Sequence, residues 1–286
     1  MKILVTGGRG QLGRSIAARG PARGHVVTAA DVAELDICDE DQLARALAAG
    51  APDLVINAAA YTAVDAAQSE RGRAYAINRD GAGTLARCCA ARAVRLLHVS
   101  TDHVFDGAAT RPYREDDRLA PLGVYGDSKA EGENAVREAG GTVVRTSWLF
   151  AAGGPSFVHT ILRLARECPV VRVVADQHGC PTWAEDLADA LLELGARPEL
   201  AATYHYCNAG ETTRHGFATA IVDEARRHRA LACERVEPIA TADYPTRARR
   251  PAYAVLDTTR VRGLGIVPPP WTIGLARVVA HALDET

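Results

Sequence analysis

The chain has 286 residues, of which 48% are apolar and 24% charged, and its formal net charge is −2. This length exceeds the usual ~100–200 residues of one domain, and the composition is that of an ordinary globular protein. A net charge so close to zero gives no electrostatic case for nucleic acid or an anionic membrane as a partner. We therefore expect one large α/β unit, or a nucleotide-binding domain with a small appended lobe.

Apolar runs and cysteines narrow the expected cellular context. The N-terminal apolar run is far too short for a signal peptide, and no stretch approaches the ~18 uncharged apolar residues of a membrane span. The seven cysteines form no Cys-x-x-Cys pair, and no histidine cluster has the spacing of a zinc site. We expect reduced thiols, a cytoplasmic protein, no metal site and no membrane partner.

The first half of the chain alternates short apolar runs with helical spacing. In chain order the pattern predicts strand 3–5, helix 11–19, strand 25–28, helix 41–49, strand 54–56, a helix over 64–91 that is broken or kinked near Gly72 and Gly81, strand 94–99, helix 129–138 and strand 142–145. Continuous apolar strands that alternate with helices predict right-handed βαβ units and a buried parallel sheet. The fold class is therefore α/β, with a doubly wound parallel sheet.

The pattern is less regular after Trp148. It predicts helices over 157–166 and 184–194, strands over 170–174 and 203–207, and a polar segment, 240–251, before a last strand and a helix over 271–283. These elements predict a smaller C-terminal α/β lobe, partly interleaved with the first domain. We assign residues 1–150 to the nucleotide-binding domain and 151–286 mainly to substrate binding.

A glycine-rich turn follows the first strand and opens the first helix. Its glycines, Gly7, Gly10 and Gly13, permit a tight turn, a close backbone approach to a pyrophosphate and close packing of the helix on the sheet. The free N–H groups of the helix N-terminus then face the phosphates. The spacing is Gly-x-x-Gly-x-x-Gly rather than Gly-x-Gly-x-x-Gly, but the flanking strand and helix predict a dinucleotide site.

Two residues give opposite indications about the adenine ribose of that cofactor. Asp31 lies 24 residues after Gly7, where an acid binds the ribose hydroxyls of NAD. Arg9 lies inside the turn and can pair with the 2′-phosphate of NADP. These two residues therefore leave both NADH and NADPH as candidate cofactors. Asp39 or Asp41 is expected to cap the following helix.

Lysine is scarce here: of 33 basic residues only Lys2 and Lys129 are lysines. Tyr125 and Lys129 have the i, i+4 spacing that places both on one helix face. An ammonium beside a phenol lowers the pKa of the phenol, which makes it a usable proton donor near neutral pH. Thr101 ends the fourth strand, at the sheet edge where catalytic side chains collect. We predict a catalytic set of Thr101, Tyr125 and Lys129; a strand-end cap at Thr101 and a surface Tyr–Lys pair are the alternatives.

Together these motifs resemble the extended short-chain dehydrogenase/reductases and, more narrowly, the dTDP-4-dehydrorhamnose reductase family. The resemblance runs over nearly the whole chain and rests on segments 57–65, 100–107, 125–129, 145–148, 176–182 and 250–251. The segments after residue 145 separate this family from other extended reductases.

The resemblance implies a Rossmann-type fold and NAD(P)H-dependent reduction of the C4 ketone of a dTDP-activated 4-keto-6-deoxyhexose, with a homodimer as the assembly to consider. Tyr125 would protonate the alkoxide, Lys129 would tune it and hold the nicotinamide ribose, and Thr101 would contact the C4 oxygen. The implied cofactor site is Gly7, Arg9, Gly10, Gln11, Leu12, Gly13, Asp31, Asp36, Ile37, Ala60, Tyr61, Thr62, Tyr125 and Lys129. The implied sugar site is Thr62, Val64, Thr101, Asp102, His103 and Trp148.

Two positions depart from the family pattern. His103 stands where the family usually has Tyr, and a histidine there would be partly charged near its ordinary pKa of ~6.5. Tyr253 stands where the family often has a small polar residue. Both departures concern which sugar fits rather than the class of reaction. Trp148 has a second interpretation, as a core aromatic.

Three other functions compete with this prediction. A sugar-nucleotide dehydratase or epimerase is disfavoured, because Asp102 is followed by His103 and the acid pair of a dehydratase is missing. A non-catalytic subunit, like the regulatory subunit of methionine adenosyltransferase that resembles this family, would not need the intact Thr101, Tyr125 and Lys129. A reductase acting on a different dTDP-4-keto sugar in natural-product biosynthesis stays open.

Overall fold

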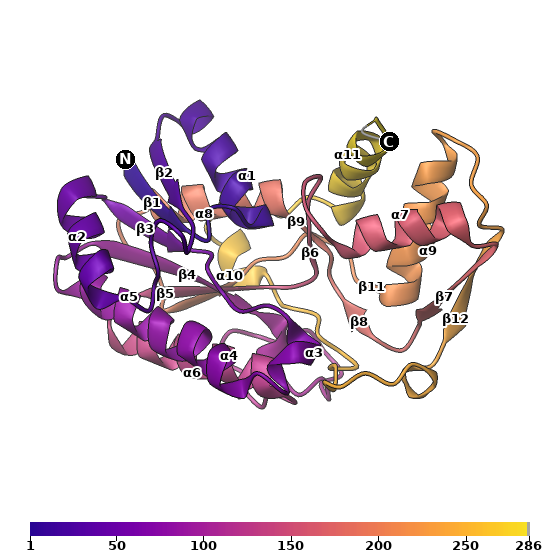
Figure 1. Ribbon diagram of the computed structural model, residues 1–286, viewed down its shortest axis with the longest axis horizontal. Helices are drawn as coiled ribbons and strands as arrows, with labels where there is room; N and C mark the ends of the chain where they lie inside the picture. The colour runs from indigo at the N-terminus through magenta and orange to yellow at the C-terminus, as the bar shows by residue number, and fades with distance from the viewer. Residues whose placement is uncertain (285–286) are drawn as a thin grey trace.

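A parallel six-stranded sheet forms the centre of the computed structural model, which describes residues 1–284 (Figure 1). Its strand order is β10-β5-β4-β3-β1-β2. The strands are β1 (Lys2–Thr6), β2 (Val26–Ala30), β3 (Leu54–Asn57), β4 (Arg95–Thr101), β5 (Thr142–Thr146) and β10 (Thr203–His205). Because every neighbouring pair is parallel, the predicted doubly wound, Rossmann-type α/β fold is confirmed.

Helices cover both faces of this sheet, as the continuous apolar strands require. Ile3 and Val5 pack with α1 (Gln11–Arg19) and α8 (Ala184–Gly195). Leu4, which points the other way, packs in the layer that contains α2 (Glu40–Gly50), α5 (Ala82–Ala90) and α6 (Val124–Glu138). The helix α8 and the strand β10 both follow residue 150, so later parts of the chain complete the first half (Figure 1). The assignment of substrate binding to 151–286 stays a prediction.

The long helix predicted over 64–91 is a series of shorter segments. These are α3 (Val64–Ala67), α4 (Arg71–Tyr75), the π-helix η2 (Ala76–Gly81) and α5. The buried Asn78 explains the widened turn, since its amide accepts a hydrogen bond from the Tyr61 backbone N–H at 2.8 Å and donates one to the Tyr61 carbonyl at 3.0 Å. Such π-turns frequently lie at functional sites.

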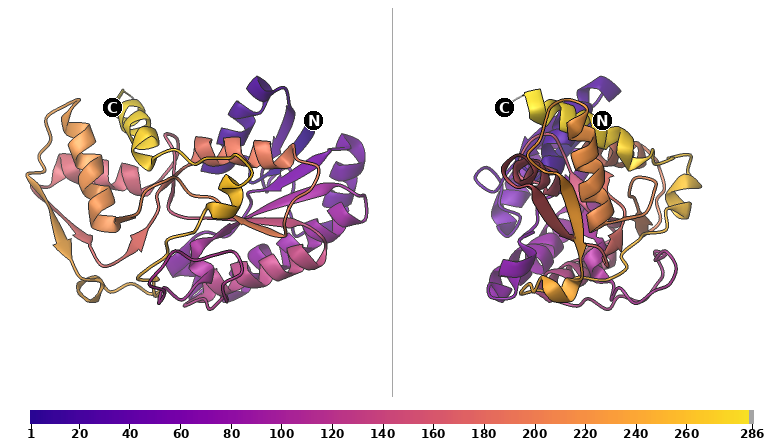
Figure 2. Two further views of the ribbon diagram at one scale, coloured as in Figure 1. Left: turned by 180° about the vertical axis from the view of Figure 1, so that it is seen from behind. Right: turned by 90° about the vertical axis from the view of Figure 1, so that its right-hand side faces the viewer.

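The C-terminal lobe lies beside the sheet half (Figure 2). It has its own apolar core, which includes Phe217, Ile161 and Val279. Its longer elements are α7 (Phe157–Glu167), β7 (Val170–Val174), α9 (Arg214–Arg226), β12 (Arg235–Ile239) and α11 (Trp271–Asp284). The remaining short elements are β6 (Leu149–Phe150), β8 (His178–Gly179), β9 (Thr182–Trp183), β11 (Thr212–Thr213), α10 (Thr259–Arg262) and the 3₁₀ turns η1 (Pro21–Arg23), η3 (Asp102–Val104) and η4 (Thr241–Asp243).

The described chain has no strand after residue 251, so the prediction of a last strand there is wrong. Tyr253 forms an isolated bridge with His178, on β8, and Leu256 forms one with Tyr113, in a loop, so the two residues do not pair with one neighbouring strand. The apolar run is buried as a loop against Phe105. Conversely, α9 and β12 had not been predicted.

The structure also describes the state of the cysteines, the grouping of potential metal ligands and the length of the apolar helices. All seven cysteines are free. Within residues 1–284, no group of three or more His, Cys, Asp or Glu side chains is placed to hold a metal ion. No helix in that part of the chain is both long and apolar enough to cross a membrane.

Candidate active site

The glycine turn forms a backbone cradle that leaves no room for side chains. Gly7 has a left-handed φ of 69°, and a Cβ on Gly13 would lie 2.2 Å from the Gly7 carbonyl oxygen. Gly10 caps α1 without any side-chain hydrogen bond, so the first N–H groups of the helix, including those of Gln11 and Leu12, have no side-chain cap. This uncapped, positively polarised helix end fits the diphosphate of a dinucleotide.

The end of β2 holds a cluster of charges beside this cradle. Asp31 accepts a hydrogen bond from the backbone N–H of Arg9 at 2.9 Å, and the Arg9 guanidinium forms an ion pair with Glu34. Glu34 had not been predicted as a site residue. Both carboxylates and the guanidinium therefore lie where the adenine ribose is expected, and Arg9 is already paired.

The segment after this cluster is held in place locally. Asp36 accepts from the backbone N–H of Cys38 at 2.9 Å, and Ile37 is buried. Asp39, rather than Asp41, caps α2 by accepting from the backbone N–H of Gln42 at 2.9 Å.

Thr101 and Tyr125 meet at the carboxyl edge of the sheet. Thr101 ends β4 and is 7% exposed, and its hydroxyl donates to Asp102 Oδ1 at 2.9 Å. Burial raises the pKa of Tyr125 to about 12, and a hydrogen bond with the Thr101 side chain opposes that rise. The predicted lowering of the tyrosine pKa by Lys129 is wrong for the free protein. The Lys129 Nζ bonds the Val99 carbonyl oxygen at 2.7 Å instead.

His103 packs against the proposed proton donor. Its ring lies edge-on to Tyr125, with centroids 5.4 Å apart and planes at 73°. Burial lowers the pKa of His103, and the nearby Asp102 carboxylate only partly opposes this. The predicted partial charge on His103 is therefore wrong, since a pKa below the ordinary value leaves the ring neutral at pH 7.

Trp148 is partly buried, packs against the apolar core of the C-terminal lobe and is held tightly by its neighbours. Its backbone has a left-handed φ of 46°, and a Cβ on Gly179 would lie 2.5 Å from the indole Cε2 atom. The Arg214 guanidinium lies 3.7 Å from the ring centroid. Burial lowers the pKa of Arg214 to about 10, and the guanidinium has no hydrogen-bonded partner in the described chain. Sequence reasoning missed Arg214, because one arginine among so many carries no signal.

A strap from the C-terminal lobe closes the site. The guanidinium of Arg250 forms two hydrogen bonds with Asp65, at 2.7 and 2.6 Å, and the backbone N–H of Ala248 also donates to Asp65, at 3.0 Å. A small cavity beneath this contact is lined by Val64, His103, Tyr125, Ala248, Arg249 and Pro251. Both residues lie in segments that the sequence analysis singled out, 57–65 and 250–251, but their pairing could not be predicted because they are far apart along the chain.

The loop after β3 carries the remaining residues of the predicted cofactor site. Ala60 and Tyr61 lie partly buried between β3 and α3, whereas Thr62 is exposed. The π-helix fixes the loop, because Asn78 bonds both backbone groups of Tyr61.

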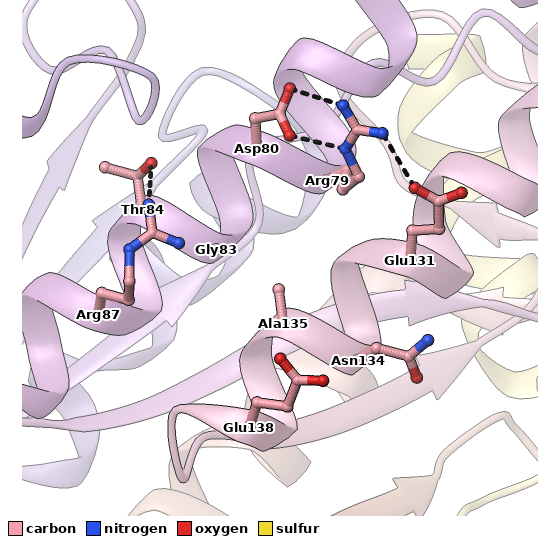
Figure 3. A pocket seen from close by; sticks show the side chains of 9 residues that line it. All are labelled: Arg79, Asp80, Gly83, Thr84, Arg87, Glu131, Asn134, Ala135 and Glu138. Atoms are coloured by element: carbon pink, nitrogen blue, oxygen red, sulfur yellow. Dashed lines mark hydrogen bonds and ion pairs between the residues drawn. The ribbon is translucent and has the colours of Figure 1, made fainter.

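A larger groove of about 420 Å³ lies elsewhere, between the helices η2, α5 and α6 (Figure 3). Its arginines are already partnered: Arg79 pairs with Asp80 and Glu131, and Arg87 donates to Thr84. None of the predicted catalytic residues lines it. The groove is therefore not the active site.

Comparison with known proteins decides among the families that share this architecture. A family model described as the RmlD substrate binding domain matches residues 1–283. The chain belongs to this family. A dTDP-4-dehydrorhamnose reductase of Burkholderia thailandensis is 42% identical over 299 aligned residues that cover 100% of both chains.

Solved structures of the same family superpose closely on this chain. A dTDP-4-dehydrorhamnose reductase from Clostridium acetobutylicum has a TM-score of 0.92 at 33% identity and 100% coverage of both chains. Another, from Bacillus anthracis, was solved in complex with NADP; its TM-score is 0.89 at 33% identity, with 100% of this chain and 99% of that one covered. The resemblance inferred from the motifs is confirmed.

Proposed function

We propose that this protein is an enzyme that reduces the C4 ketone of a dTDP-4-keto-6-deoxyhexose with NADPH or NADH. The observation that carries the proposal is the contact between the buried Thr101 and the partly buried Tyr125, at the sheet edge that also carries the glycine cradle, in a member of the RmlD family. A proton donor beside a dinucleotide site is what reduction of a ketone requires.

A bound NAD(P)H would supply the hydride for C4, and side chains of this protein would stabilise the charge that forms and provide the proton. Tyr125 donates its phenolic proton to the oxygen of the former ketone. Thr101 holds that oxygen and the phenol in one geometry. Lys129, on the same face of α6, would hold the nicotinamide ribose when the cofactor binds.

Two unpaired groups fit the rest of such a substrate. The Asp102 Oδ2 atom is buried without a hydrogen-bond partner, so a sugar hydroxyl would satisfy it. The partly buried Arg214 cation, stacked on Trp148, offers a charge for the diphosphate. These contacts support a nucleotide sugar rather than a free sugar as substrate.

The test is oxidation of NADPH and NADH, followed by absorbance, against a panel of dTDP-4-keto sugars. Turnover is expected with at least one of them, and Tyr125→Phe should lower kcat by ~10²-fold or more while leaving NADPH binding nearly intact. No oxidation with any sugar would favour the non-catalytic alternative. Full activity in Tyr125→Phe would exclude the assigned proton donor.

A further inference from the structure

The buried polar side chains behind Lys129 form a hydrogen-bonded chain that the mechanism above does not use. Thr6, Asn57, His98 and Lys129 lie on β1, β3, β4 and α6 and are all at most 2% exposed. Asn57 Nδ2 lies 2.9 Å from His98 Nδ1, and His98 Nε2 lies 3.1 Å from Lys129 Nζ. A buried polar chain of this kind must match each donor to an acceptor.

The Asn57 amide fixes which nitrogen of His98 carries the proton. Its Oδ1 atom accepts from the Thr6 hydroxyl at 2.7 Å and from the backbone N–H of Ala59 at 3.1 Å. A flipped amide would turn an NH₂ group toward the Ala59 N–H, so Oδ1 must face these donors. Asn57 Nδ2 then donates to His98 Nδ1. Because Nδ1 is the acceptor, the neutral ring carries its hydrogen on Nε2.

That tautomer limits the protonation state of the Lys129 amino group. The Nε2–H of His98 faces the Lys129 Nζ, which must offer a lone pair to receive it. Only a neutral amine has one, because an ammonium has three donors and no acceptor. A neutral amine also keeps a hydrogen for the Val99 carbonyl oxygen, 2.7 Å away. Both contacts are satisfied at once only when Lys129 is uncharged.

The charges around Lys129 permit this state. Glu133, on the same helix and 0% exposed, is the carboxylate that favours a charged lysine, but Arg145 donates to it twice, at 2.9 and 2.7 Å, and Arg137 once, at 2.9 Å. Its charge is therefore already balanced. Tyr125, one turn before Lys129, is a neutral phenol. Burial lowers the pKa of Lys129 to about 8, and Glu133 opposes that fall.

We propose that His98 is a positioning residue whose Nε2–H donates to Lys129 and thereby favours the neutral form of this amino group in the free protein. An amino group held in this way gains and loses a proton near the working pH, whereas an ordinary lysine stays an ammonium. The consequence of this hydrogen bond for catalysis rests on the proposed function, whereas the ionisation of Lys129 can be measured independently of that function.

The presence of only two lysines allows a direct measurement. In protein labelled with ¹³C at lysine Cε, NMR should show two signals, and a Lys2→Arg variant assigns the remaining one to Lys129. Lys129 should titrate at least ~1 pH unit below the exposed Lys2. Titration of Lys129 together with Lys2 would overturn the proposal.

Three variants test the role of His98. His98→Leu removes the donor, so the Lys129 pKa should rise by ~1 unit or more. His98→Gln should keep the wild-type value, because its amide oxygen can accept from Asn57 while its NH₂ donates to Lys129. Asn57→Ala should raise the Lys129 pKa with His98 in place, because the tautomer is no longer fixed; this variant serves if His98→Leu does not fold. An unchanged Lys129 pKa in the folded Leu or Ala variant would refute the assignment.

The pH profile of reduction separates this role from a merely structural one. The basic limb of kcat/KM should move to higher pH in His98→Leu and stay in place in His98→Gln. A uniform loss of rate without movement of the limb would contradict the link to catalysis. If Lys129 titrates as expected but no dTDP-4-keto sugar is reduced, the proposed function fails and the His98 assignment stands.

Discussion

At the scale of single residues, we expect the preference between NADH and NADPH to depend on Asp31 and Glu34, which follow β2, and on Arg9 in the glycine turn. Asp31 and Glu34 place negative charge where a 2′-phosphate would lie, and Glu34 also occupies the Arg9 guanidinium. The sequence indicated the conflict between Asp31 and Arg9. It did not reveal Glu34, because an acid in a turn has no distinguishing pattern until the fold brings it to Arg9.

Releasing Arg9 should therefore shift the preference toward NADPH. Glu34→Gln removes a negative charge and frees the guanidinium, so the ratio of kcat/KM for NADPH to that for NADH should rise ~3- to 10-fold. The control is Glu167→Gln, which breaks a similarly exposed ion pair, with Arg163, on α7. An unchanged ratio in Glu34→Gln, or an equal rise in Glu167→Gln, would argue against this role of Arg9.

At the scale of elements, close packing of α6 on the π-helix positions the proposed catalytic residues. A Cβ on Gly132 would lie 2.0 Å from the Asn78 carbonyl oxygen, and the Asn78 side chain bonds Ser128 at 3.0 Å. The helix that carries Tyr125 and Lys129 is thereby fixed against the segment that holds the loop after β3. The sequence predicted a helix on both sides but not the π-turn, which depends on a contact between them.

Gly132→Ala should test this contact. The methyl group would collide with backbone, so we expect a loss of about 1–3 kcal/mol in the free energy of unfolding, measured as a lower Tm by calorimetry. Gly72 is the matched control, since it also lies in a helix and a Cβ there meets nothing within 4 Å. Gly72→Ala should be neutral or stabilising by ~0.5–1 kcal/mol. Equal Tm values for the two variants would show that the contact is not tight.

At the scale of the whole molecule, the strap at 240–251 joins the C-terminal lobe to the nucleotide-binding half. Figure 1 shows this segment returning from β12 toward α3, where Arg250 and Ala248 bind Asp65. Arg250 holds the pKa of Asp65 at about 2. Because this pKa is depressed, the contact is present above the unfolded value of ~3.9 and is lost only as the pH falls through about 2.

Breaking this contact should weaken sugar binding selectively. In Arg250→Met we expect KM for the sugar nucleotide to rise ~3- to 10-fold, with KM for the cofactor nearly unchanged. The effect should be equal at pH 6 and pH 9, because Asp65 is ionised at both. Arg163→Met, an exposed arginine on α7, is the control. A comparable rise in the cofactor KM would mean that the strap supports the whole fold rather than the sugar site.

The sequence by itself determined the parallel sheet, the glycine cradle, the Asp39 cap and the Tyr125–Lys129 spacing. Each of these depends on local conformation or on a short period, which neighbouring residues specify. Only the tertiary structure decided the buried chain of contacts from Asn57 through His98 to Lys129, the lowered pKa of His103 and the pairing of Arg250 with Asp65. These depend on burial and on partners far apart in the chain. Removal from water and the match of donors to acceptors follow from the assembled fold, not from the order of residues.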